Sequence, residues 1–85
     1  MSDTFLNQNL YESIIDLCRE NSIAKISNLT ITVHKNSHIK EETIRKHFAK
    51  NKNGLVDRRT NIQIQKQENE PLIATIDRID GEKYQ

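Results

Sequence analysis

Apolar residues recur every three or four positions near the start of the chain, which places them on one face of a helix. The pattern predicts an amphipathic helix over residues 3–20, with Ser2 or Asp3 as its cap. Asn21 is expected to be the left-handed residue that ends it, followed by Ile23 as an apolar contact. The positions that share the apolar face are Leu6, Leu10, Ile14 and Leu17.

The pattern then changes to strict alternation. Leu29, Ile31 and Val33 fall on one side of an extended chain, and the residues between them are polar. This alternation predicts a strand over residues 29–34 with one face exposed to water.

A second helix is predicted over residues 41–50. Ile44 and Phe48 are four positions apart and share a face, while Glu41 and Glu42 occupy the first turn, where the helix dipole favours acidic groups. The residues around Gly54 should end this helix.

Two further strands complete the chain. Ile62 and Ile64 alternate with polar residues, and residues 72–79 are rich in β-branched side chains. A turn at residues 68–71 separates the two strands, so we expect them to pair in antiparallel fashion. Asp80 and Gly81 are expected to end the last strand.

The predicted order is therefore helix, strand, helix, strand, strand. Each helix has one apolar stripe and each strand one apolar side, which favours two helices packed on one face of a small mixed sheet of about three strands. We expect a single α+β domain over residues 1–85, because 85 residues cannot form two independent cores.

The charge of the chain is almost balanced but unevenly distributed. Thirteen basic and twelve acidic residues give a net charge of +1. Residues 35–59, however, hold eight basic and three acidic groups, a local charge of +5. This basic segment is the candidate binding surface, either for an acidic protein or for nucleic acid. Its candidate partner-binding residues are Lys40, Arg45, Lys46, Lys50, Lys52, Arg58 and Arg59.

Catalytic and metal chemistry have little support in the sequence. Cys18 is the lone cysteine and is expected to be a small buried thiol. The three histidines, His34, His38 and His47, lack the helical spacing that would aim two of them at one ion. We therefore predict no enzyme activity, no cofactor and no metal site. The absence of a long apolar run predicts a cytoplasmic protein that does not span a membrane.

Positions from the first helix to the second alternating strand also follow a more specific pattern. They are Leu6, Gln8, Leu10, Ile14, Ile31, Thr32, Val33, Ser37, Ile39, Glu42, Ile44, Phe48, Gly54, Ile62 and Ile64. Over most of residues 1–66 this pattern resembles the N-terminal domain of the HypA family of hydrogenase nickel-insertion accessory proteins. The resemblance implies a HypA-like α/β scaffold with an accessory role.

Two features of that family are missing from the sequence. Its members open with Met-His-Glu, which binds nickel, whereas this chain opens with Met1, Ser2 and Asp3. The family also has two Cys-x-x-Cys pairs around a structural zinc, whereas this chain has one cysteine. A serine hydroxyl is a poor nickel ligand, so the resemblance implies the scaffold without its metal chemistry.

Three hypotheses follow for function. The first is a non-enzymatic interaction or accessory module that binds an acidic protein through the basic segment. The second is a small nucleic-acid-binding or regulatory protein that uses the same residues. The third is a divergent nickel-handling protein of hydrogenase maturation.

Overall fold

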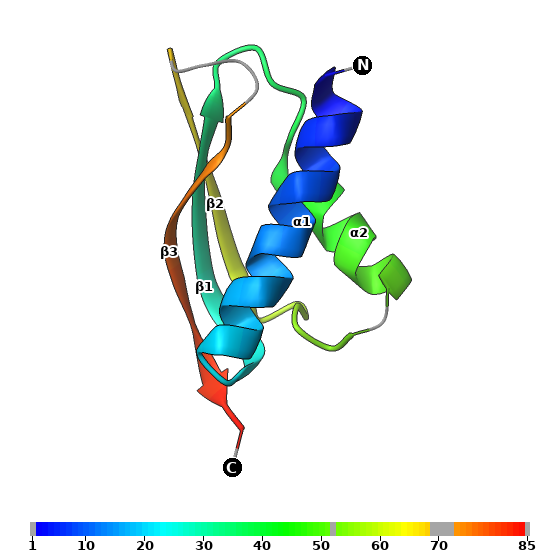
Figure 1. The fold of residues 1–85 in the computed structure, drawn as a ribbon, viewed down its shortest axis with the longest axis vertical. Helices are drawn as coiled ribbons and strands as arrows, with labels where there is room; N and C mark the ends of the chain where they lie inside the picture. The colour runs from blue at the N-terminus through cyan, green and yellow to red at the C-terminus, as the bar shows by residue number, and fades with distance from the viewer. Residues whose placement is uncertain (1, 52, 69–72, 85) are drawn as a thin grey trace.

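The computed structural model describes residues 2–51, 53–68 and 73–84, with side chains from Gln8 onward. Its elements are α1 (Ser2–Glu20), β1 (Ile23–His34), α2 (Glu41–Asn51), β2 (Asn61–Gln67) and β3 (Thr75–Lys83). Both helices lie on one side of a three-stranded mixed sheet (Figure 1). This arrangement confirms the predicted α+β fold and the predicted order of its elements.

The strand order in the sheet is β2-β1-β3. β1 runs parallel to β2, with Ile31 opposite Ile64, and antiparallel to β3, with Ile31 opposite Ile76. Because two parallel neighbours need a crossover, α2 connects β1 to β2 across one face of the sheet.

The core lies between this face and the helices. Leu29, Ile31 and Val33 of β1 have no exposed surface, as the alternation predicted. One buried cluster joins them to both helices and to β2, and Ile64 packs against its margin. Its other members include Leu10, Tyr11, Ile14, Cys18, Ile39, Ile44, Phe48 and Ile62.

The predicted partner of the last strand is wrong. We expected it to pair with β2 through a short turn, but β3 pairs with β1 on the opposite side of the sheet. This order gives the most deeply buried strand two neighbours, so its backbone is bonded along both sides. It also brings Ile76 and Ile79 of β3 against the core.

The bounds of β1 and β3 also differ from the prediction. β1 begins at Ile23, six residues before the alternation becomes regular, and β3 continues through Gly81 to Lys83. The register between β1 and β3 shifts in this region. Buried and exposed residues therefore do not alternate strictly along the sequence there. Gly81 is required there because a Cβ at this position would overlap the backbone oxygen of Lys25.

The turn after α1 uses a different residue from the one expected. Ser22, and not Asn21, has the left-handed conformation, with φ of 58°. Asn21 instead donates a 2.9 Å hydrogen bond from its side-chain amide to the carbonyl oxygen of Leu17. The amide therefore satisfies an end carbonyl of the helix, and the chain reverses one residue later. Ile23 is buried as expected.

Candidate functional site

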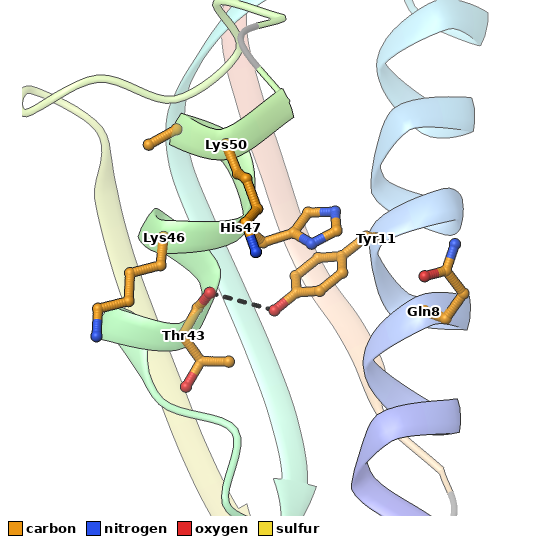
Figure 2. Close-up of a pocket in the computed structure, with 7 residues that line it drawn as sticks. Gln8, Tyr11, Thr43, Lys46, His47 and Lys50 are labelled. Atoms are coloured by element: carbon orange, nitrogen blue, oxygen red, sulfur yellow. Dashed lines mark hydrogen bonds between the residues drawn. The ribbon is translucent and has the colours of Figure 1, made fainter.

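An open pocket of about 720 Å³ lies between α1 and α2. Figure 2 shows Tyr11 reaching from α1 toward α2, where its hydroxyl donates a 3.3 Å hydrogen bond to the carbonyl oxygen of Thr43. We call this pocket the interhelix groove. Its lining residues are Gln8, Tyr11, Thr43, Lys46, His47, Ala49 and Lys50.

Two stacked rings form the inner wall of the interhelix groove. The ring centroids of Tyr11 and His47 are 3.4 Å apart and their planes differ by 12°. Phe48 packs edge-on against both rings, with centroid distances of 5.8 Å to Tyr11 and 5.7 Å to His47. Since Phe48 belongs to the core, the groove wall is supported directly by the hydrophobic interior.

The surroundings keep His47 neutral. Burial, and then the positive charge of Lys50, lower the pKa of His47 below its ordinary value of 6.5. Burial likewise raises the pKa of Tyr11, so its phenol keeps its proton and acts as a donor. The positive charge of the groove therefore comes from its lysines.

Lys46 and Lys50 supply that charge. They are one helical turn apart on α2, both are exposed, and both line the interhelix groove (Figure 2). Among the residues whose side chains the structure describes, none that lines the groove is acidic. The structure thus brings two of the predicted partner-binding residues together beside an aromatic wall.

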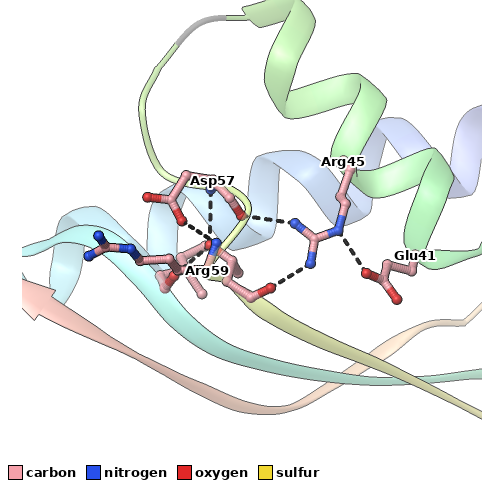
Figure 3. Close-up of polar contacts among 6 residues, drawn as sticks. Glu41, Arg45, Asp57 and Arg59 are labelled. Carbon is pink, nitrogen blue, oxygen red and sulfur yellow. Dashed lines mark hydrogen bonds and ion pairs between the residues drawn. The ribbon is translucent and has the colours of Figure 1, made fainter.

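Arg45 has a different role from the one its charge suggested. It donates to the Glu41 carboxylate at 2.7 Å, to the carbonyl oxygen of Asp57 at 2.9 Å, and to the carbonyl oxygen of Thr60 (Figure 3). These bonds tie α2 to the loop that precedes β2. The guanidinium of Arg45 is therefore engaged within the protein.

Asp57 organises the same loop. Its carboxylate accepts a hydrogen bond from the backbone N–H of Arg59 at 2.8 Å and pairs with Lys25 at 3.1 Å. The Arg59 N–H, followed by Lys25, lowers the pKa of Asp57. Polar contacts hold the loop in place: Lys25 links it to β1, and Arg45 links it to α2 (Figure 3).

Lys40, Arg58 and Arg59 are not among the residues that line the interhelix groove. Lys40 is exposed just before α2, and the Arg59 side chain is exposed on the loop. Arg58 lines a second open pocket of about 490 Å³ between α2 and the loop, but Glu41 and Asp57 line it too. Lys52 lies outside the described residues.

Catalytic and metal-binding groups do not converge in the part of the chain that the structure describes. Cys18 is buried as expected, and burial raises the pKa of its thiol, which disfavours the nucleophilic thiolate. His34 accepts a 3.1 Å hydrogen bond at Nδ1 from the backbone N–H of Asn36. Among the described residues, no group of three or more His, Cys, Asp or Glu side chains could hold a metal ion.

The pairing of Tyr11 with His47 was missed at the level of sequence. A signal was present, because Tyr11, Ile14 and Cys18 are spaced by three and four and form an apolar stripe beside the predicted one. All three are buried, whereas Leu17 of the predicted stripe is only partly buried. The face of α1 toward the core is thus rotated slightly, and this rotation turns Tyr11 toward α2.

Comparison with known proteins adds no relative. No protein-family model, curated protein or solved structure matches the chain. Neither helix, over its described residues, has the length and apolar character needed to cross a membrane.

Proposed function

We propose that the chain is a non-enzymatic interaction module that binds an acidic segment of a partner protein in the interhelix groove. The observation that carries this proposal is the position of Lys46 and Lys50. Both lysines are exposed and line the same open pocket as the stacked rings, and none of the described residues that line it is acidic.

The charges in the groove favour an anionic ligand. Two lysines one turn apart repel each other weakly, and a carboxylate placed between them would relieve that repulsion. Exposed ion pairs contribute little affinity individually, so their main effects are on the association rate and on specificity. Binding should therefore weaken as the salt concentration rises.

The rings supply the second part of the recognition. Tyr11 is only 4 % exposed and stacks on His47, so the partly exposed imidazole of His47 is the ring that an apolar or aromatic side chain of the partner can cover. An acidic segment with one such side chain would match both the charge and the surface of the groove. The resemblance to the HypA scaffold supports an accessory role of this kind.

A binding titration tests the proposal. The probe is a fluorescein-labelled peptide of alternating Glu and Asp around one central Leu, measured by anisotropy from about 50 mM to about 200 mM salt. We expect salt-sensitive binding that is lost in the variant with Lys46→Glu and Lys50→Glu.

A matched control changes the same net charge elsewhere. Arg19→Glu with Arg78→Glu alters two side chains that are 76 % and 62 % exposed and lie outside the groove. This control should bind the peptide nearly as well as the original chain. Equal losses in both double variants would show that only net charge matters and would contradict the proposal.

Nucleic acid forms a separate arm of the titration. Single-stranded and duplex oligonucleotides carry the same label and are measured over the same salt range. Binding of an oligonucleotide with a steep salt dependence, without binding of the peptide, would favour the nucleic-acid hypothesis instead.

A further inference from the structure

The two edges of the sheet differ in character. β3 forms one edge, and its sequence includes Asp77, Arg78, Asp80, Glu82 and Lys83, together with irregular pairing to β1. Charges and bulges of this kind keep an edge from pairing with another strand. β2 forms the other edge, where Lys66 is the only charged residue and the register with β1 is regular.

The register determines which backbone groups of β2 face outward. Lys35 donates its backbone N–H to the carbonyl oxygen of Gln67 at 2.8 Å, so Gln67 bonds toward β1. In a parallel pair, alternate residues of a strand bond to the same neighbour. The backbone groups of Gln63 and Gln65 therefore also face β1, and those of Ile62, Ile64 and Lys66 face away from the sheet.

Outside the β1–β2 ladder, no backbone hydrogen bond from the described residues reaches these outward groups. A second strand placed along β2 could bond to all of them, because they are spaced two residues apart on a regular strand. The edge is therefore a template for strand addition.

We infer that a second copy of this chain occupies the edge, with the two β2 strands antiparallel and Ile64 opposite Ile64. This register is the one that matches every outward group. Ile62 then opposes Lys66 of the other copy, and each opposed pair exchanges two hydrogen bonds. The two sheets would join into one continuous sheet.

The side chains favour the same register. Ile64 is only partly buried in one chain. At the seam, the line where the two β2 strands meet, Ile64 of the second copy would cover it. Lys66 opposes an isoleucine and not a second lysine, and its ammonium group already donates to the carbonyl oxygen of Ser37 at 2.6 Å. On the other face Gln63 would oppose Gln65, and amides on opposed residues can bond to each other. The pairing thus places no like charges opposite each other.

Sedimentation equilibrium up to millimolar concentration tests the inference. The original chain should form a dimer, whereas Ile64→Lys and Ile64→Glu should each remain monomeric because like charges meet at the centre of the seam. An equimolar mixture of the two variants should dimerise again, since Lys then opposes Glu. Circular dichroism checks that both variants remain folded.

A second pair of variants tests the backbone directly, should position 64 not tolerate a charge. Lys66→Pro removes one outward N–H without touching the ladder to β1, and Lys66→Gln keeps that N–H while removing the ammonium group. Only the proline variant should lose the dimer. A chain that is monomeric at every concentration, or a dimer that survives both Ile64→Lys and Lys66→Pro, would overturn the inference.

Discussion

The imidazole of His47 lies almost parallel to the phenol ring of Tyr11, with 3.4 Å between the ring centroids. The two residues belong to different helices, so the stack joins α1 to α2 at the wall of the interhelix groove. Because burial and Lys50 lower the pKa of His47, the stack is a contact between two neutral rings at neutral pH.

This contact should make stability depend on pH. The unfolded chain binds a proton at His47 near its ordinary pKa of 6.5, whereas the folded chain binds it only at lower pH. The contribution of His47 to stability is thus complete above that value and is lost as the pH falls toward the lower, folded pKa. Urea unfolding from about pH 8 to about pH 5 should show a smaller acid loss for His47→Gln than for the original chain. The same acid loss in both proteins would contradict this prediction.

Phe48→Ala should destabilise the domain strongly. Phe48 is 2 % exposed and contacts both rings of the stack, so its removal leaves a cavity beneath the groove. We expect a cost of roughly 3–5 kcal/mol in the free energy of unfolding, measured with urea. Lys50→Ala, on an exposed position of the same helix, is the control and should change stability by less than about 0.5 kcal/mol. An unchanged urea midpoint for Phe48→Ala would show that Phe48 does not pack in the core as described.

The hydroxyl of Thr60 should be needed for the loop before β2. Thr60 is 2 % exposed, donates to the carbonyl oxygen of Ile26 at 2.8 Å and accepts from the backbone N–H of Asp57 at 3.0 Å. Thr60→Val keeps the shape but leaves these groups without a partner, at a cost of about 1–3 kcal/mol. Thr60→Ser keeps the hydroxyl and should retain both hydrogen bonds. If chemical denaturation finds the valine variant as stable as the original chain, this role is refuted.

Gly81→Ala should disrupt the pairing of β1 with β3. The added Cβ would meet the backbone oxygen of Lys25 and a side-chain atom of Ile23, so a strand must move. The comparison is Gly54→Ala, where φ is +76° but no atom lies within 4 Å of the added Cβ. Both variants should be destabilised, and faster amide exchange along β3 should appear in Gly81→Ala alone. If the amides of β3 exchange at the original rate in Gly81→Ala, the close approach of Gly81 to the Lys25 backbone is absent.

The amino terminus should not hold nickel tightly. Ser2 offers a hydroxyl in place of an imidazole, and Asp3 adds only oxygen donors. Calorimetric titration with nickel should therefore detect nothing tighter than about the micromolar range, roughly −8 kcal/mol. Submicromolar binding of one ion that disappears on deletion of Ser2 and Asp3 would restore the nickel-handling hypothesis.

The sequence by itself determined the elements and their apolar sides. Apolar residues recur every three or four positions around Ile14 and Ile44, and every second position around Ile31. These spacings follow from the geometry of a helix and of a strand, so they reveal which side of each element is buried. Two helices and three strands, each with one apolar side, then have few ways to cover one another. The order of the elements and the packing of both helices on one face followed from this.

Only the tertiary structure decided which elements meet and what the charges do. Nothing in the spacing of Ile76 states whether β3 lies beside β1 or β2, because pairing depends on how the connecting chain crosses the sheet. Arg45 and Lys46 are adjacent and alike in charge, yet one bonds to the loop and the other lines the groove. A one-residue step turns a side chain about 100° around a helix, so neighbours in sequence face different surroundings. These surroundings exist only once the chain has folded.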